Sequence, residues 1–391
     1  MARQPQAQQA AAPPPEPAST TGGPAPQEAG GTLTIDLGAI AANYKTLLAR
    51  VMPSECAAVV KGDAYGCGIN QVTTALSRAG CQTFFVAHLS EARRVRAIAP
   101  QAAIYVLNGF SHAAGQAFVE TEARPVLNSL IELAEWDHFV STCSFAGSAA
   151  LHVDTGMNRL GLSIEEAAAI ASHIRSENHR VTLLMSHLAC AERPEHPLND
   201  QQIRQFREIR SLFRGIGSSL ANSSGIFLDA STYCDVVRPG IALYGGNPTP
   251  GKPNPMRPVI DLKTHVLQVR DVAKGAAVGY GATWTAKRNS RIAVIAAGYA
   301  DGIARAATIT ESAAPREVVA AGRRCRIVGR VSMDLIALDV TDLPANAVRR
   351  DQTVTLIGEG LSLDDVATQS GTIAYEVLTS LGHRFHRVWK A

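Results

Sequence analysis

The stretch VVKGDAYGCG, residues 59–68, places a lysine at the end of an apolar run and follows it with turn residues. The apolar run, residues 57–60, is typical of a buried parallel strand, and Gly66 and Gly68 favour a turn before a helix. A lysine at the tip of such a strand has its stem in apolar surroundings, and burial lowers the pKa of an ammonium group. Lys61 is therefore a candidate for an amine that forms a Schiff base. The alternative is a strand-end lysine whose ammonium group reaches solvent.

Around this lysine the chain alternates short apolar runs with amphipathic helical stretches. Order is expected to begin with the strand TLTIDL, residues 32–37, in which Asp36 is placed to cap the following helix. About eight strand candidates then recur roughly every 20 to 40 residues, which is typical of repeated βα units. Such a series predicts an α/β fold, a (βα)8 TIM-like barrel. The runs are CAAVVK, TFFVAH, AIYVLN, ARPVLN, AALHVDT, TLLMSHL, SSLANS and CDVVRPG.

Polar residues fall at the carboxyl ends of several of these runs. They are Lys61, Asp154, His187, Asn222 and Arg238. In a βα barrel the carboxyl ends of the strands meet on one face, and that face carries the chemistry. Polar residues that only formed hydrogen bonds within the core would not be expected to recur at the carboxyl end of so many strands. We therefore expect these side chains to meet in one site.

The motif HVDTGMNRLG, residues 152–161, presents Arg159 at the predicted barrel mouth. A guanidinium group there can hold a carboxylate or a phenolate through two hydrogen bonds, and an ion pair with a neighbouring acid is an equal alternative. His187, in MSHLACAE, fits a base, a metal ligand or a ring that stacks on an aromatic cofactor. The only partner at metal-ligand spacing is Cys190, in a loose pairing, so a metal site is not expected.

The motif DVVRPGIALYG, residues 235–245, offers a place for a phosphate. Backbone N–H groups at Gly240 and Ile241 can cradle an anion if a helix starts there. Ser223, after the seventh run, offers a hydroxyl to the same place, and phosphate sites after the seventh and eighth strands recur in these barrels. Glycines after strands also occur in simple turns, so both interpretations stay open.

Beyond about Pro258 the pattern changes to β-rich segments broken by Gly, Asn and Asp turns, and the Pro- and Gly-rich linker GGNPTPGKPNP precedes the change. Three regions are expected: a disordered tail over residues 1–31, the barrel over 32–256 and a mostly β domain over 257–391. The tail is rich in Pro, Ala, Gln and Gly, and it has no large aliphatic residue with which to form a core.

Composition limits the possible partners and compartments. The net charge of +3 is small for 391 residues and the basic residues are scattered, so neither nucleic acid nor a membrane is expected as a partner. The seven cysteines form no CxxC pair, which favours free thiols in a reducing compartment. The tail lacks the apolar core of a signal peptide, which predicts a cytoplasmic protein.

Taken in order, several motifs resemble those of the pyridoxal-phosphate-dependent alanine racemases, and the resemblance runs from about Thr32 to the C-terminus. It implies a barrel followed by a β domain, pyridoxal 5'-phosphate as the cofactor, and a head-to-tail homodimer with shared active sites. The implied activity is interconversion of L- and D-alanine by two-base proton transfer, which supplies D-alanine for cell-wall peptidoglycan. The motifs are VVKGDAYGCG, HVDTGMNRLGL, VVRPGIALYG, GYGATW, AAGYADG, GRVSMD and TIAYEV.

The resemblance also implies roles for individual residues. Lys61 matches the lysine that carries the cofactor and acts as the base on the D side. Tyr280 matches the opposite base, which the partner subunit contributes. Arg159 and the backbone N–H of Met333 match the pair that holds the substrate carboxylate. The positions that line the entrance and the second side of the site are Tyr299 and Asp334, and the cofactor-binding positions are Lys61, Tyr65, His187, Asn222, Ser223, Arg238, Gly240, Ile241 and Tyr375.

Arg238 matches an arginine that faces the pyridine nitrogen of the cofactor. Because an arginine is effectively always protonated, it should leave that nitrogen unprotonated. The cofactor is then a poorer electron sink than one paired with a carboxylate, which should suppress transamination.

One position departs from the family pattern. Many members carry a carbamate-modified lysine two residues before DTGM, and His152 occupies that position here. An imidazole cannot reproduce the negative charge of the carbamate beside Arg159. Either another acceptor orients Arg159, or the position tolerates a weaker partner.

Three alternatives remain beside an alanine racemase. A racemase that prefers serine or another small amino acid differs only in substrate. A decarboxylase with the same domain order lacks support, since the Cys-Asp pair of those enzymes is not apparent in the second domain. A non-catalytic pyridoxal-phosphate carrier built on the barrel alone would have no use for the β domain that holds Tyr280.

Overall fold

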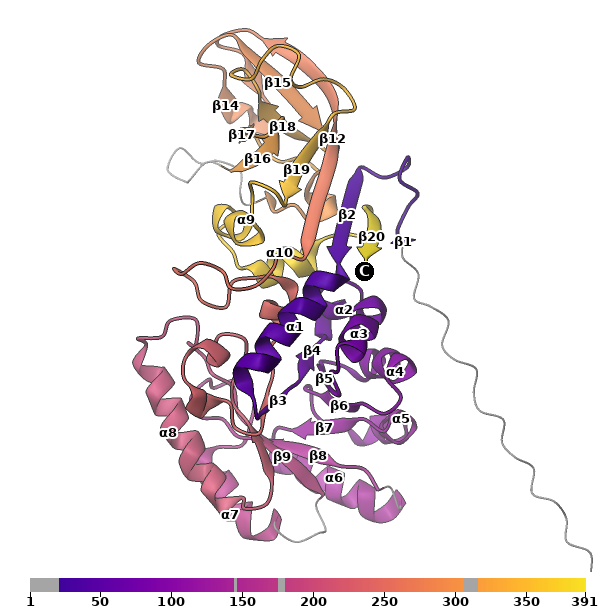
Figure 1. Ribbon diagram of the computed structural model, residues 1–391, viewed down its shortest axis with the longest axis vertical. Coiled ribbons are helices and arrows are strands. Elements are labelled where there is room, and N and C mark those ends of the chain that lie inside the picture. Colours follow the sequence, from indigo (N-terminus) through magenta and orange to yellow (C-terminus); the bar gives the residue numbers. More distant parts are fainter. Residues whose placement is uncertain (1–20, 144–145, 175–179, 306–315) are drawn as a thin grey trace, which may run out of the picture.

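The chain folds into a βα barrel and a second, mostly β domain, which lie one after the other along the long axis of the molecule (Figure 1). The computed structural model describes residues 21–143, 146–174, 180–305 and 316–391. A βα barrel followed by a β domain is the fold class that the sequence predicts.

The barrel is a parallel sheet that closes on itself. From β4 to β10 each strand pairs in parallel with the next strand of the chain. The ring closes through β11, because the Ala57 N–H donates to the Val237 carbonyl at 3.0 Å and the Asp235 N–H donates to the Ser218 carbonyl at 3.0 Å. The strands are β3 (Glu55–Cys56), β4 (Ala58–Val59), β5 (Thr83–Val86), β6 (Ala103–Val106), β7 (Arg124–Leu127), β8 (Ala149–His152), β9 (Val181–Met185), β10 (Gly217–Ser219) and β11 (Val236–Val237).

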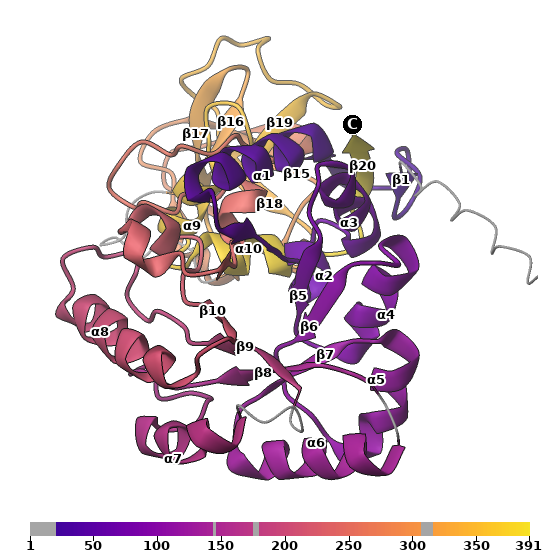
Figure 2. The ribbon, with the colours of Figure 1, turned by 60° about the horizontal axis from the view of Figure 1, so that its bottom comes forward.

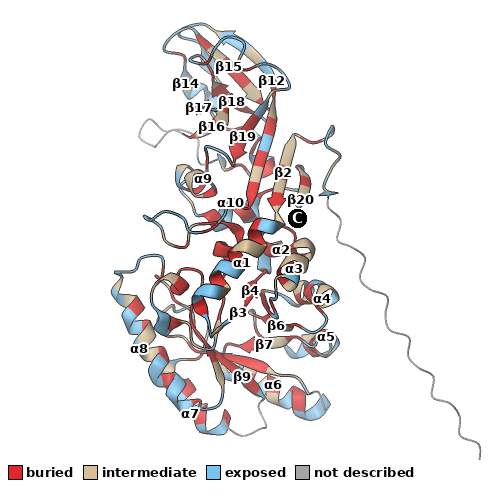
Figure 3. Cartoon of the chain, in the orientation of Figure 1, coloured by how far each residue is buried: buried red, intermediate tan, exposed pale blue. Residues whose placement is uncertain are grey.

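Helices surround the barrel strands (Figure 2). Asp36 begins the first of them as expected, since its Oδ1 accepts the Ala39 N–H at 2.7 Å. Phe84, Phe85 and Trp136 are fully buried in the core, while α7 and α8 turn exposed faces to solvent (Figure 3). The helices are α1 (Leu37–Val51), α2 (Lys61–Tyr65), α3 (Ile69–Arg78), α4 (Leu89–Ile98), α5 (Gly115–Thr121), α6 (Leu130–Cys143), α7 (Ile164–Ile174) and α8 (Pro197–Leu212), with short 3-10 helices η1 (His112–Ala114), η2 (Gly225–Phe227), η3 (Ala230–Thr232) and η4 (Ile241–Tyr244).

The second domain is built on a mainly antiparallel sheet. Its strand order begins with β1 (Thr21–Gly22), β20 and β2 (Gly31–Asp36) and continues as β12-β15-β18-β17-β16-β19. Ser362 caps its helix α9, because the Ser362 Oγ accepts the Asp365 N–H at 3.1 Å. The elements are β12 (Ile260–Val272), β13 (Ala277–Val278), η5 (Tyr280–Ala282), β14 (Trp284–Thr285), β15 (Ser290–Ile295), η6 (Tyr299–Asp301), β16 (Glu317–Ala320), β17 (Arg323–Val328), β18 (Ile336–Asp339), β19 (Thr353–Ile357), α9 (Leu363–Gln369), α10 (Ala374–Ser380) and β20 (His386–Lys390).

The N-terminal boundary differs from the one expected at residue 32. Strand β2 (Gly31–Asp36) pairs with β12 and β20, so it belongs to the sheet of the second domain and not to the barrel. Ahead of it, β1 (Thr21–Gly22) pairs with β20, and the His386 ring lies 2.9 Å from the Pro24 carbonyl. The expected tail was therefore drawn too long, since Thr21, Gly22 and Pro24 contact the C-terminal strand and Gly31 begins β2. The first 20 residues lie outside the described part of the chain.

Two features of the described ranges concern membranes and metal ions. None of their helices is long and apolar enough to cross a membrane. Nor do they contain a group of three or more His, Cys, Asp or Glu side chains that could hold a metal ion. The cysteines are free thiols, most of them buried, although Cys143 is exposed.

Candidate active site

A cavity of about 1240 Å³ opens at the carboxyl ends of the barrel strands. The structure brings most of the candidate residues to its wall. Asp154 is an exception, because its Oδ1 accepts the N–H groups of Gly156 and Met157 at 2.8 Å each and so shapes the turn after β8. The candidates that line the cavity are Lys61, Tyr65, Arg159, His187, Asn222, Ser223, Arg238, Gly240 and Tyr375.

Lys61 begins a turn of left-handed helix instead of the ordinary helix start. Residues with side chains rarely adopt this conformation, which costs roughly 1–2 kcal/mol each. Inside the turn, the Gly66 N–H donates to the Gly62 carbonyl at 2.8 Å. Because this conformation is unfavourable for residues with side chains, contacts from the surrounding structure must hold the turn in place. The φ angles are 63° at Gly62, 52° at Asp63, 54° at Ala64, 55° at Tyr65 and 76° at Gly66.

The environment of Lys61 favours a neutral amine. Solvent reaches the open side of the cavity, but protein atoms surround much of the side chain. This burial lowers the pKa of Lys61, and the positive charges of Arg159 and Arg238 lower it further. Glu91 opposes them and raises it.

Arg238 is buried and is held by neutral acceptors. Its guanidinium group donates to the Ser219 hydroxyl and, at 2.6 Å, to the Ser186 carbonyl. Among the described residues, none of its hydrogen bonds goes to a carboxylate, and burial lowers its pKa to about 10. Arg238 also approaches the His187 Nδ1 at 3.3 Å. Because a guanidinium only donates, that nitrogen accepts, and the proton of the neutral imidazole lies on Nε2.

His187 is neutral for two reasons. It is half-buried, and this loss of solvent lowers its pKa well below the usual range, while the charge of Arg238 lowers it further. A neutral ring beside a cavity wall can pack against a flat aromatic group without adding positive charge.

Ser223 and the turn after Arg238 form a cradle for an anion. The Ser223 Oγ accepts the N–H groups of Gly240 and Ala242 at 2.9 and 3.2 Å. Since a hydroxyl oxygen with both lone pairs occupied still has its own proton, Ser223 can donate to an anion. A Cβ at Gly240 would lie 2.1 Å from the Tyr65 hydroxyl oxygen, so a side chain there would close the space. Ile241, which follows, is buried and does not line the cavity.

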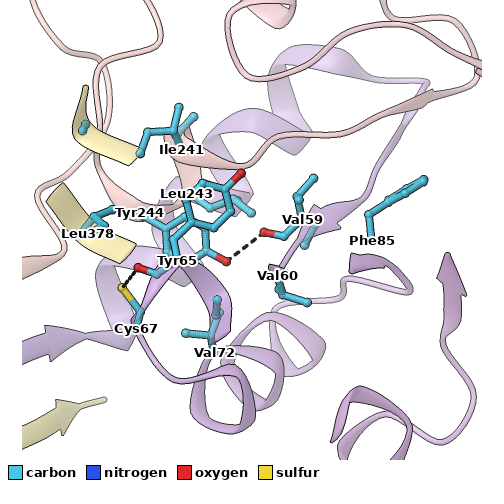
Figure 4. Close-up of a cluster of buried hydrophobic side chains, with 14 of the residues drawn as sticks. Val59, Val60, Tyr65, Cys67, Val72, Phe85, Ile241, Leu243, Tyr244 and Leu378 are labelled. Carbon is cyan, nitrogen blue, oxygen red and sulfur yellow. Dashed lines mark hydrogen bonds between the residues drawn. The ribbon is translucent and has the colours of Figure 1, made fainter. Parts of the chain in front are cut away.

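Stacked tyrosines support this cradle. The rings of Tyr65 and Tyr244 stack with centroids 4.5 Å apart, and Figure 4 shows the Tyr244 hydroxyl directed at the Val59 carbonyl, to which it donates at 2.9 Å. Tyr375, from α10, lies 5.8 Å from Tyr65. Tyr375 exposes 39% of its surface, and the burial of the rest raises its pKa, so its hydroxyl keeps its proton and can donate.

Apart from Tyr375, the candidates in the second domain lie away from this cavity. Tyr280 exposes 73% of its surface and Met333 exposes 53%. Neither lines the cavity of its own chain, and the same holds for Tyr299 and Asp334. The Tyr299 N–H donates to the Ser332 carbonyl at 3.0 Å and the Ala300 N–H donates to the Met333 carbonyl at 3.0 Å, so the two motifs form one surface.

Comparisons with known proteins match both domains. The family model described as alanine racemase, N-terminal domain, matches residues 35–248, and the one described as alanine racemase, C-terminal domain, matches residues 259–389. An alanine racemase of Methylobacterium sp. (strain 4-46) is 51% identical over 360 residues, which cover 92% of this chain and 98% of that protein. The chain belongs to the alanine racemase family.

Solved structures of alanine racemases share the fold. The enzyme from Bartonella henselae, whose crystal structure has covalently bound pyridoxal phosphate, is 38% identical, with a TM-score of 0.87 over 93% of this chain and 100% of that one. The biosynthetic enzyme from Pseudomonas aeruginosa is 34% identical, with a TM-score of 0.85 over 93% of this chain and 100% of that one.

The cavity has the groups that this cofactor requires. Lys61 offers an amine with a lowered pKa, and Ser223 with Gly240 offers a cradle that a Cβ would fill. Arg238 and His187 present a buried cation and a neutral ring on the same wall. The residues present therefore fit a pyridine ring that carries a phosphate and an aldehyde carbon.

His152, the departure from the pattern of alanine racemases, has a partner that the sequence did not reveal. Its Nδ1 donates to the Asn128 Oδ1 at 2.8 Å, and the Asn128 Nδ2 donates in turn to the Val126 carbonyl at 2.8 Å. Burial, followed by the charge of Arg238, lowers the pKa of His152 to about 4, so the imidazole is neutral. His152 therefore supplies no negative charge for Arg159.

Sequence reasoning missed Asn128, Glu91 and Gln202. The Gln202 Nε2 donates to the His187 carbonyl at 2.9 Å and to the Thr155 hydroxyl at 3.2 Å, which ties α8 to the barrel mouth. Asn128 follows a predicted strand at the same phase as the other candidates, so that signal was present. Glu91 lies in a helix, where a carboxylate in the first turn is usually explained by capping.

Proposed function

We propose that this protein interconverts L- and D-alanine, with pyridoxal 5'-phosphate held covalently at Lys61. The observation that carries the proposal is the meeting, in one cavity, of a lysine of lowered pKa and an anion cradle at Ser223 and Gly240. Membership of the alanine racemase family supports the reaction type. In the cell, we place the protein in the cytoplasm, where it would supply D-alanine for peptidoglycan.

The chain would hold the cofactor covalently through Lys61 at one end and through its phosphate at the other. When bound, pyridoxal phosphate withdraws electrons from the α-carbon of an amino acid and acidifies its α-proton. The Tyr65, Ser223 and Tyr375 hydroxyls and the Ile241 N–H would bind the phosphate in the open space at Gly240, whose own N–H holds the Ser223 Oγ. Asn222 would border the same space, since its Oδ1 accepts the Gly225 N–H at 2.9 Å and fixes the loop behind Ser223.

Arg238 would set the electronic character of the ring. Its guanidinium group donates to the Ser219 hydroxyl and the Ser186 carbonyl, which fix it in place from behind. A fixed donor next to the pyridine nitrogen takes no proton and delivers none. The ring nitrogen would stay unprotonated, which favours return of the α-proton over transamination. His187, neutral with its proton on Nε2, would border the ring without changing this charge balance.

Two bases on opposite faces of the α-carbon would perform the racemisation. The Lys61 amine would take or return the α-proton on the D side, and the Tyr280 hydroxyl on the L side. In each direction one base accepts a proton while the other donates one, so the substrate gains and loses one proton. Arg159 and the Met333 N–H would hold the substrate carboxylate.

Tyr280 and Met333 would reach this site from a second copy of the chain. Both are exposed, and both lie outside the cavity of their own chain. We therefore propose a homodimer in which the surface formed by the GYGATW, GYADG and GRVSMD motifs closes the partner's cavity, with Tyr299 and Asp334 at the entrance. A site completed only in the dimer would also exclude water from the reacting groups.

The test is incubation of the purified protein with L-alanine and, separately, with L-serine, followed by chiral analysis. We expect D-alanine to form, and Lys61 to carry the label after borohydride reduction and peptide mapping. Racemisation of serine in preference to alanine would change the substrate but keep the mechanism. Bound cofactor at Lys61 without turnover of either amino acid would favour a carrier, and release of carbon dioxide would favour a decarboxylase.

A further inference from the structure

Glu91 joins the loop after Lys61 to the helix that follows the next barrel strand. It lies in the first turn of α4 and lines the cavity. Its Oε1 accepts the Gly62 N–H at 2.7 Å and the Asp63 N–H at 3.4 Å. Its Oε2 accepts the Ala87 N–H at 2.9 Å and the His88 N–H at 3.3 Å. One carboxylate thus binds two separate segments of the barrel mouth.

The two oxygens of Glu91 serve different purposes. Oε2 satisfies N–H groups at the start of α4, which is the usual role of an acidic residue in a first helical turn. Oε1 is not needed for that role, because it faces the left-handed turn. A carboxylate offers about four lone-pair sites, so it can serve both segments together.

The left-handed turn needs a partner of this kind at its start. The N–H groups of Gly62 and Asp63 are the first donors of the turn, and a helical turn leaves its first donors without internal acceptors. Asp63, Ala64 and Tyr65 keep a strained backbone only if surrounding contacts enforce it. Because Lys61 is joined directly to Gly62, a change in the turn would redirect the lysine side chain.

We propose that Glu91 is a positioning residue for Lys61: it holds the left-handed turn so that the lysine amine points into the cavity. The inference rests on the proposed function, because Lys61 must act in that cavity. The negative charge of Glu91 also acts on Lys61 and raises its pKa, against the lowering by burial and by Arg159 and Arg238. Glu91 therefore fixes both the direction and the charge balance of the lysine.

The test variant is Glu91→Gln, and the matched control is Glu166→Gln. Glutamine keeps the size of the side chain and one acceptor oxygen, but its NH2 group cannot accept from the second pair of N–H groups. Glu166 lies in the first turn of α7, where its Oε2 accepts the Ser163 N–H at 2.8 Å, and it does not line the cavity. The control thus removes a carboxylate with only the capping role.

Three measurements on the cofactor-loaded proteins separate positioning from capping. The first is the rate of cofactor loss on dialysis, which the absorbance of the lysine-bound form reports. The second is kcat and KM for L-alanine, and the third is the melting temperature. For Glu91→Gln we expect cofactor loss to become about 10-fold faster and kcat to fall about 10-fold, as for loss of a charge-assisted hydrogen bond. KM should change less than kcat. Glu166→Gln should resemble wild type except for a small fall in melting temperature.

Each outcome decides between the two roles. Equal cofactor loss and equal kcat in the two variants would overturn the inference and leave Glu91 as a helix cap. If Glu91→Gln does not fold, Glu91→Asp replaces it with the same outcomes, because the shorter side chain cannot span both segments. A wild-type protein that lacks the cofactor or does not racemise alanine would refute the proposed function instead.

Discussion

Arg387 donates a hydrogen bond of 2.6 Å from its Nη1 to the carbonyl oxygen of Gly66, at the end of the turn that follows Lys61. Beside it, the Trp389 Nε1 donates to the Cys67 carbonyl at 2.7 Å. Both donors are buried and come from β20, a strand of the second domain. The second domain thus fixes the far end of the left-handed turn, and Glu91 fixes the near end.

The Trp389 contact gives a direct test of this link between the domains. Trp389→Phe keeps most of the ring packing but leaves the Cys67 carbonyl without its donor. We expect the free energy of unfolding to fall by about 1–2 kcal/mol, as for a buried acceptor that loses its partner. We also expect the variant to lose cofactor faster than wild type. Urea denaturation and dialysis of the loaded protein measure the two effects, and no change in either would show that the turn does not depend on the Trp389 hydrogen bond.

Arg384 joins the two motif loops that carry Tyr299 and Met333. Its guanidinium group holds Asp301 with contacts of 2.8 and 3.1 Å, and Asp334 with one of 2.8 Å. Asp301 is buried, so removal of its cation should be costly. We expect Arg384→Met to lower the free energy of unfolding by about 1–3 kcal/mol and to reduce racemisation, because both loops lose their shared anchor.

The matched control for that variant is Arg288→Met. Arg288 pairs with Asp342 at 2.5 Å, but both side chains are exposed. Exposed ion pairs contribute little to stability, so this variant should unfold and turn over like wild type. Chemical denaturation and a racemisation assay on both variants make the comparison, and an equal loss in the two would contradict the anchoring role of Arg384.

His152 should make the protein sensitive to mild acid. Its pKa is lowered to about 4 in the folded chain, whereas an unfolded histidine titrates near 6.5. As the pH falls below about 6.5, His152 binds a proton in the unfolded state but not in the folded state. Stability is therefore lost between pH 6.5 and 4. From pH 7 to pH 5, this one residue should remove about 2 kcal/mol.

The variant that tests this dependence is His152→Gln. A glutamine amide can still donate to the Asn128 Oδ1 but does not titrate in this range. Denaturation of both proteins at pH 7 and pH 5 should show a smaller loss in the variant. His187 also contributes to the loss of stability at low pH, but it does so in both wild type and variant, so its contribution cancels when the two losses are subtracted. Identical losses would mean that His152 is not held neutral by its burial.

Complementation tests the shared active site. Lys61→Ala and Tyr280→Phe homodimers should each be nearly inactive. In a mixed dimer, the intact Lys61 receives Tyr280 from the other chain, so one site of two is whole. Random reassortment makes about half of the dimers mixed, and about a quarter of wild-type activity should return. If both bases came from one chain, every site would lack one of them, and hybrid dimers demonstrated by mass would remain inactive.

The sequence by itself determined the barrel, the phase of its polar residues and the family. These features are local, because the spacing of apolar, Gly and capping residues predicts each strand, turn and helix. Asp36 illustrates this, because its capping role depends on residues three positions away. Lys61 and Arg238 were likewise found from the strands that precede them.

The tertiary structure alone decided how these parts support one another. It placed β2 in the sheet of the second domain, gave His152 its partner Asn128, and set Glu91 and Arg387 at the two ends of the turn after Lys61. Arg387 and Gly66 are 321 positions apart in the chain. Such contacts leave no local pattern, because they are selected by the packing of whole elements and not by the residues beside them.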